Sequence, residues 1–171
     1  MKRVQGGFSL IEILVTIGIL MVGLLGLAAL QTNATVAEME AYQRSQALVL
    51  VQDMADRISA NKANAASYVA NDIGLAVVNC AALTGAALDK CEWGNQLAGA
   101  AEVTAGGVKV GAMIGARGCI TSPSANVYMV TVAWQGFSKA GGPAVLCGNG
   151  AYGAGLRRTF STIVRVALLA A

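Results

Sequence analysis

An α+β fold, with one long N-terminal helix packed on a small antiparallel β-sheet, is predicted by two patterns in the sequence. An apolar run at residues 8–30 passes directly into an amphipathic segment at residues 31–60, which together read as one helix. Short segments rich in β-branched and aromatic residues, broken by glycine, follow in residues 108–171. An apolar helix face and the apolar face of a sheet can bury one another by packing together.

The composition indicates a membrane segment joined to a globular part. Hydrophobic residues make up 56% of the 171 residues and charged residues 12%, well below the ~25% that is typical of soluble domains. The apolar excess is concentrated at the N-terminal end, which favours a membrane segment over an unusually apolar core. The formal charge is +3, and only about +1 without Lys2 and Arg3, so no clustered basic face for nucleic acid is expected.

The apolar run is predicted to span a membrane. As a helix, residues 8–30 would extend roughly 35 Å at ~1.5 Å per residue, enough for a bilayer core of ~30 Å. Lys2 and Arg3 precede the run, so the start of the chain is expected in the cytoplasm and the rest on the far side. A secretory signal peptide is the alternative. The apolar region of a signal peptide usually covers only ~7–15 residues, which is shorter than this run. A signal peptide also does not require a carboxylate such as Glu12, and an ionised carboxylate costs a few kcal/mol in hydrocarbon.

Residues 6–12 read Gly-Gly-Phe-Ser-Leu-Ile-Glu, which resembles the processing signature of type IV pilins. The resemblance implies that a prepilin peptidase cuts after Gly7 on the cytoplasmic side and methylates the new N-terminus, Phe8. Glu12 would then be the fifth residue of the mature chain. In a filament core its carboxylate could neutralise the terminal ammonium of a neighbouring subunit, which would offset the desolvation of both charges and set the axial register.

The segment after the apolar run is predicted to continue the helix outside the membrane. Its apolar stripe, spaced as on one helix face, comprises Ala47, Leu50, Val51, Met54 and Ile58. Two pairs place an acid four residues before a base, Glu40 with Arg44 and Asp53 with Arg57. Each pair would stabilise the helix by a few tenths of a kcal/mol. Glu38, Glu40 and Arg44 are expected to face solvent, with contacts to other subunits as the alternative.

The sheet is predicted from alternating residues in the C-terminal part of the chain. Residues 61–107 are expected to form an irregular connecting region. The predicted strands are Val108–Ile114, Val127–Gln135 and Thr159–Leu169. Gly141-Gly142-Pro143 and Gly148–Gly155 mark turns between them. In the second strand, one face carries Tyr128, Val130, Val132 and Trp134.

No enzyme, cofactor or metal site is predicted. The sequence contains no histidine, which excludes Ser-His and Cys-His catalytic pairs and every histidine-ligated metal site. None of its four cysteines forms a CxxC motif, so zinc and thioredoxin-like sites are disfavoured. Trp93 and Trp134 are assigned to the core, and Arg157-Arg158 to a solvated strand end.

The four cysteines suit two disulfides formed outside the cytoplasm. Three connectivities are possible, and the one preferred joins Cys80 to Cys91 and Cys119 to Cys147, because local pairing costs the least chain entropy. The second bridge would join the loop before the second strand to the turn after it. Closing a loop of ~10 residues should stabilise the fold by around 2–3 kcal/mol.

Beyond the N-terminus the chain resembles the PilV-type minor pilins, or type IV pilus modification proteins. The residues that carry this resemblance are Tyr42, Arg44-Ser45-Gln46-Ala47, Gln52-Asp53-Met54-Ala55-Asp56-Arg57-Ile58, Ala60-Asn61, Gly115-Ala116-Arg117-Gly118-Cys119-Ile120, Val130-Thr131-Val132-Ala133-Trp134-Gln135-Gly136, Cys147-Gly148, Tyr152-Gly153 and Arg157-Arg158. The resemblance implies low-abundance incorporation, help in starting pilus assembly, and a tip or adhesive role.

The same resemblance implies partners and a location. Residues 1–7 would be a cleaved cytoplasmic leader, residues 8–30 the membrane or filament-core part, and residues 31–171 a periplasmic head. The implied partners are the prepilin peptidase, other minor and major pilins, the inner-membrane assembly machinery and, before assembly, membrane lipid. The protein would sit in the inner membrane and then in the extracellular pilus.

Two other functions fit parts of the pattern. A minor pseudopilin of type II secretion would share the architecture and belong to a different machine, and neighbouring genes would distinguish the two. A membrane-anchored periplasmic binding or adhesion module would never polymerise. Glu12 disfavours this alternative, because a helix that serves only as a membrane anchor does not require a buried acid.

Overall fold

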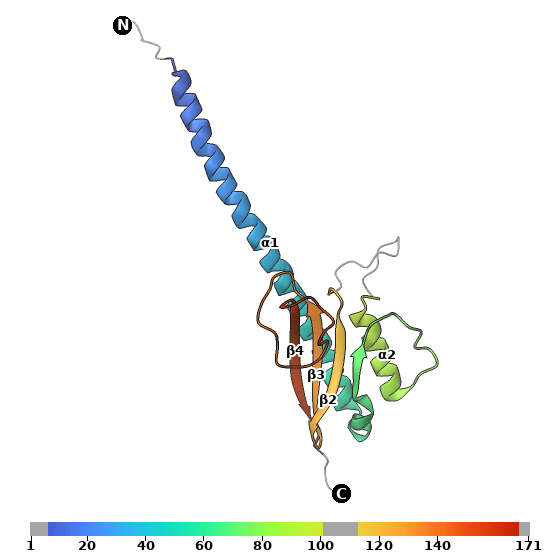
Figure 1. Cartoon of the computed structure of the whole chain (residues 1–171). Helices are drawn as coiled ribbons and strands as arrows, with labels where there is room; N and C mark the ends of the chain where they lie inside the picture. Colours follow the sequence, from blue (N-terminus) through green and yellow to red (C-terminus); the bar gives the residue numbers. More distant parts are fainter. Residues whose placement is uncertain (1–6, 101–112, 168–171) are drawn as a thin grey trace. The chain divides into compact units, whose positions relative to one another are not determined.

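A computed structural model describes residues 7–100 and 113–167 of the chain (Figure 1). Contacts between residues divide the chain into two compact units, Met1–Met39 and Glu40–Ala171. Helix α1, Leu10–Ala60, supplies the described helix of the first unit and continues into the second. No proline precedes Pro123, so α1 contains no residue that lacks a backbone donor.

The part of α1 in the second unit buries one side, as the sequence predicts. The buried residues of this face are Gln43, Ala47, Val51, Met54, Ala55 and Ile58. Leu50 is only partly buried and packs at the margin of the core. The ion pair predicted between Asp53 and Arg57 is present, with 3.1 Å between Oδ2 and Nε.

The connecting region is more regular than predicted. It contains the 3₁₀ segment η1, Lys62–Tyr68, the short strand β1, Ala70–Ile73, and helix α2, Gly85–Leu97. Trp93 and Leu97, one helical turn apart on α2, are buried, and the indole Nε1–H of Trp93 donates to the carbonyl of Leu50 at 2.8 Å. This anchoring to α1 explains why a segment with little helical signal is ordered as a helix.

The remaining strands complete a four-stranded antiparallel sheet in the order β1-β2-β3-β4 (Figure 1). Their bounds are β2 Arg117–Ser124, β3 Val127–Gln135 and β4 Arg157–Arg165. The prediction for β3 is confirmed. The prediction for β4 is wrong at both ends, because pairing with β3 begins at Arg157 and stops at Arg165, opposite Val127.

The first predicted strand, Val108–Ile114, can be compared with the structure only at its last two residues. Residues 108–112 lie outside the described residues, and Met113 and Ile114 are not in a strand. The strand that pairs with β3 is instead β2, which contains Gly118 and Pro123. Both residues resemble turn signals, but Gly118 lies against Trp93, and Pro123 lies beside a register shift between Thr121 and Ser124.

The core of the second unit lies between α1, α2 and one face of the sheet. The four alternating residues of β3 predicted to share a face are all buried there: Tyr128, Val130, Val132 and Trp134. Both tryptophans of the chain belong to this cluster, as predicted. On the opposite face of the sheet a second, smaller cluster joins Cys119, Ala133 and Cys147.

Candidate functional site

The predicted processing site lies just before the first turn of α1. Gly7, Phe8 and Ser9 precede the helix and are exposed, with 81% of the Phe8 surface accessible. A Cβ atom added to Gly7 would meet no atom within 4 Å. The described part of the chain therefore places no steric demand for glycine at this position.

Glu12 lies in the first turn of α1 and is exposed. Its backbone N–H donates to the carbonyl of Ser9 at 3.0 Å, which starts the helix. Among the described residues, no side chain pairs with its carboxylate. In an apolar environment this charge would need a partner that the described residues do not supply.

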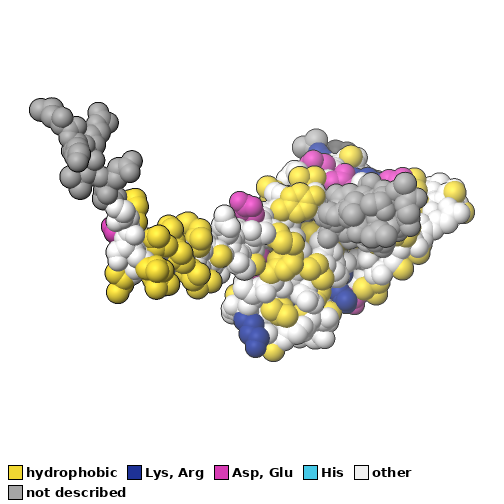
Figure 2. Space-filling view, turned by 90° about the horizontal axis from the view of Figure 1, so that it is seen from above, with side chains coloured by type: hydrophobic (Ala, Val, Ile, Leu, Met, Phe, Trp, Pro, Cys, Tyr) yellow, Lys and Arg dark blue, Asp and Glu magenta, His cyan; other side chains and the backbone are white. Residues whose placement is uncertain are grey.

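Residues 10–30 of the first unit form a largely apolar helical surface (Figure 2). The large apolar residues exposed on it are Leu10, Ile11, Ile13, Leu14, Val15, Ile17, Ile19, Leu20, Met21, Val22, Leu24, Leu25, Leu27 and Leu30. The helix is long and apolar enough to cross a membrane. A surface of this extent is unstable in water and indicates burial in lipid or against other protein chains.

Both disulfides have the pairing preferred from the sequence. Cys80 is bonded to Cys91, and Cys119 is bonded to Cys147. The first bridge ties the loop after β1 to helix α2. The second joins the β3–β4 loop to the sheet, but Cys119 lies within β2 and not in a preceding loop, which corrects that detail.

Glu40 does not face solvent as predicted, and its ion pair is with Arg158 and not with Arg44. Its Oε1 accepts hydrogen bonds from the backbone N–H of Phe137 at 3.2 Å and of Ser138 at 3.0 Å, and from the Ser138 hydroxyl at 2.8 Å. A guanidinium nitrogen of Arg158 lies 3.4 Å away. The hydrogen bond from the Ser138 hydroxyl lowers the pKa of Glu40. Partial burial of the carboxylate raises this pKa, but the net shift is downward.

The basic pair at the start of β4 is likewise bonded and not simply solvated, which corrects the prediction. Arg157 donates to the carbonyls of Val145, Cys147 and Pro143 at 2.6, 2.9 and 3.0 Å. Arg158 donates to the Ser138 carbonyl at 2.6 Å as well as lying beside Glu40. These side chains hold the long β3–β4 loop against the sheet and α1, a role that the sequence did not indicate because the partners are remote along the chain.

The described residues contain no cluster of three or more side chains that could hold a metal ion. The candidate functional surface of this protein is the predicted processing site, Gly7 and Phe8, together with the exposed apolar helix that follows it. A rigid, disulfide-bonded second unit accompanies it.

Comparison with known families gives two matches that adjoin along the chain. Residues 2–28 match the prokaryotic N-terminal methylation motif, and residues 29–99 match the family described as Type IV pilin Tt1218. No curated protein and no solved structure matches the chain.

The two family matches, together with the long helix and the antiparallel sheet, support a pilin subunit of the type IV pilin superfamily. The methylation motif implies processing by a prepilin peptidase and contacts with other pilins, and the apolar helix fits membrane anchoring before assembly.

Proposed function

We propose that this chain is a minor pilin of a type IV pilus, of the PilV type, which helps to start or modify pilus assembly. The observation that carries the proposal is a lone acid, Glu12, at the start of an exposed apolar helix directly behind a glycine that the fold does not require. A membrane anchor alone would need neither the acid nor the glycine.

In this proposal the chain has three parts with separate tasks. Residues 1–7 form the leader, which the peptidase removes, so that methylated Phe8 becomes the first residue. Residues 8–30 hold the subunit in the inner membrane and later form filament core. Residues 31–171 form the periplasmic head, which the pilus carries out of the cell and which could contribute to tip or adhesive functions.

The acid supplies specificity that the apolar side chains cannot. Lipid tails and neighbouring helices are about equally apolar, so moving the helix from membrane to filament gains little from the hydrophobic effect. An ion pair between Glu12 and the terminal ammonium of the next subunit would favour one axial position over others. Removing one member of a buried pair costs about 3–5 kcal/mol, because the other charge stays buried without a partner.

The minor role within the pilus is supported by sequence blocks that resemble those of PilV-type proteins, such as the segment 52–58 on α1 and the strand segment 130–136. In the structure these blocks build the head itself. Segment 52–58 contributes buried residues on α1, and segment 130–136 forms most of β3. The resemblance to PilV-type proteins therefore lies in the head, and it supports the proposal separately from the motif at the N-terminus.

The test is to tag the head at an exposed loop and to measure the chain in sheared pili and in membranes, alongside a deletion strain. The expected result is a small but reproducible amount in the pilus fraction, and fewer surface pili in the deletion strain. Intact pili together with a loss of type II secretion in that strain would identify a minor pseudopilin instead. Absence of the tagged chain from both filaments would contradict any role as a filament subunit.

A further inference from the structure

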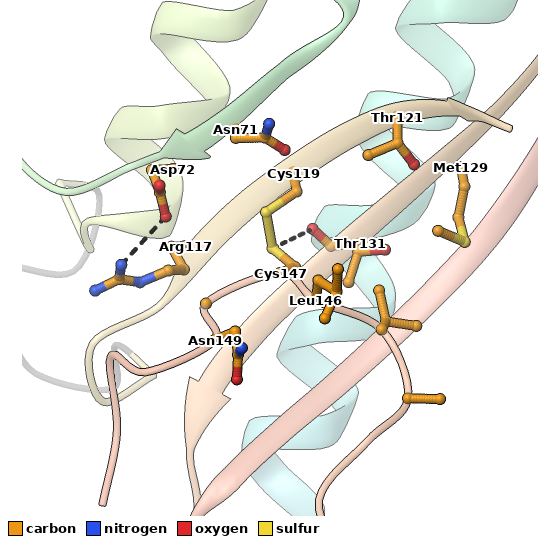
Figure 3. A pocket seen from close by; sticks show the side chains of 13 residues that line it. Asn71, Asp72, Arg117, Cys119, Thr121, Met129, Thr131, Leu146, Cys147 and Asn149 are labelled. Atoms are coloured by element: carbon orange, nitrogen blue, oxygen red, sulfur yellow. Dashed lines mark hydrogen bonds and ion pairs between the residues drawn. A yellow bond between two sulfur atoms is a disulfide. The ribbon is translucent and has the colours of Figure 1, made fainter.

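A groove of about 640 Å³ lies on the face of the sheet that is opposite α1 (Figure 3). Its floor is formed by β2 and β3, and the β3–β4 loop lies over one side. The Cys119–Cys147 disulfide and the three hydrogen bonds from Arg157 hold this loop in place. The groove is therefore preformed, and its volume lies within the ~300–1,000 Å³ that is usual for ligand sites.

Two asparagines without a hydrogen-bond partner among the described residues line the groove. Asn71, on β1, lies at one rim, and Asn149, on the β3–β4 loop, lies at the other. Both residues are exposed, and neither side chain forms a hydrogen bond to any described part of the chain. Each amide therefore offers one donor group and one acceptor to a ligand without first breaking an internal bond.

The described residues that line the groove carry no net charge. The charged ones among them are Asp72 and Arg117, which form an ion pair of 3.2 Å. Arg117 is further fixed by the ring of Tyr152, 5.4 Å from its guanidinium carbon. Because the pair neutralises itself, the groove offers no attraction to phosphate, nucleic acid or a strongly acidic peptide.

The chain itself shows what an asparagine of this kind can bind. On α2, the Asn95 side chain accepts from the backbone N–H of Val78 at 2.8 Å and donates to the carbonyl of the same residue at 2.8 Å. One amide thus pairs with both backbone polar groups of one residue that lies outside any helix or strand. Asn71 and Asn149 carry the same group in an open groove.

We propose that this groove binds an uncharged, extended peptide segment of a partner protein. The two asparagines would pair with backbone groups of the peptide, and Met129 with Leu146 would contact an aliphatic side chain. Leu146 is 75% exposed at the mouth of the groove, an apolar surface that such a side chain would cover. A glycan is disfavoured, because none of the described residues that line the groove is aromatic and could stack on a sugar ring.

The experiment uses the full chain in nonionic detergent micelles and an array of synthetic 12-residue peptides that tile the periplasmic sequences of the co-expressed pilus proteins. A glycan array is probed in parallel. The strongest peptide is labelled and its Kd measured by fluorescence polarisation for the parent, Asn71→Ala, Asn149→Ala and Leu146→Asp. Asn33→Ala, the same substitution on the first part of α1, is the matched control.

The expected result is binding of an uncharged peptide, with a Kd raised about fivefold or more by each groove substitution and unchanged by the control, since each amide forms up to two hydrogen bonds. All four substituted residues are exposed, so tryptophan fluorescence should show an unchanged fold. No peptide binding below 1 mM, binding unaffected by the groove substitutions, or binding of a glycan in place of a peptide would each overturn the proposal. None of these results bears on the role of the helix in assembly, which is tested separately.

Discussion

Replacing Glu40 by glutamine should destabilise the head by about 1 kcal/mol near neutral pH. Oε1 of Glu40 accepts three hydrogen bonds from Phe137 and Ser138, and Arg158 lies beside it. Hydrogen bonds to a charged group contribute about 1.5–3 kcal/mol each when buried. Here the side chain is 31% exposed, which screens the charge, and glutamine keeps an acceptor oxygen, so only part of that energy is lost.

The stabilisation of the head by the Glu40 carboxylate should decrease as the pH falls. The folded-state pKa of Glu40 is lowered below its ordinary value of 4.5, chiefly by the Ser138 hydroxyl. A lowered pKa means that the stabilisation is fully present above pH 4.5 and is lost as the pH falls through the folded-state value. The difference in stability between the parent and Glu40→Gln should therefore be present at pH 7 and vanish in acid.

The two tryptophans make the measurement possible in the full chain. Both are buried in the second unit, so their fluorescence reports unfolding of the head while the apolar helix stays in a detergent micelle. Urea titrations at several pH values would compare the parent, Glu40→Gln and the control Glu38→Gln, which removes the same charge from an exposed residue with no partner among those described. Equal stability of the parent and Glu40→Gln at pH 7, or a difference that persists in acid, would refute the reasoning.

Three further outcomes are expected. Gly7→Ala should block leader removal, so a mature-size band on an immunoblot would contradict the assigned cut. Gly118→Ala should destabilise the head by about 1–3 kcal/mol in a urea titration, because the added Cβ would lie 2.1 Å from the Trp93 ring, whereas Gly142→Ala, with nothing within 4 Å, should have little effect. Thiol alkylation of the native, unreduced protein should label no cysteine in the 119–147 bridge or elsewhere, and labelling of two or more would overturn the disulfide assignment.

The elements that could be predicted from the sequence are those with a strong local pattern. Helix α1 follows from an unbroken apolar run and a stripe at helical spacing. Strand β3 follows from strict alternation, which places Tyr128 and Trp134 on the same buried face. The disulfide pairing follows from the short separation of 11 positions between Cys80 and Cys91, because joining these two leaves Cys119 and Cys147 for each other.

The elements that were missed depend on contacts between distant residues. Helix α2 contains two glycines and is ordered by Trp93, which packs on β2 and bonds to α1. Strand β1 has only four residues and includes Asp72 in the left-handed region, with a φ of 55°. The partners of Glu40 lie 97 to 118 positions further along the chain, so no local pattern could have indicated them.

The most direct test of the assembly mechanism is the amount of Glu12→Ala in sheared pili, normalised to the amount of processed subunit in the membrane. Because the carboxylate has no partner inside the described monomer, the substitution should leave cleavage and head stability intact. It should lower incorporation severely, since the terminal ammonium of a neighbouring subunit would be buried unpaired. Incorporation equal to that of the parent would contradict the pairing of this acid with a neighbour and the account that rests on it.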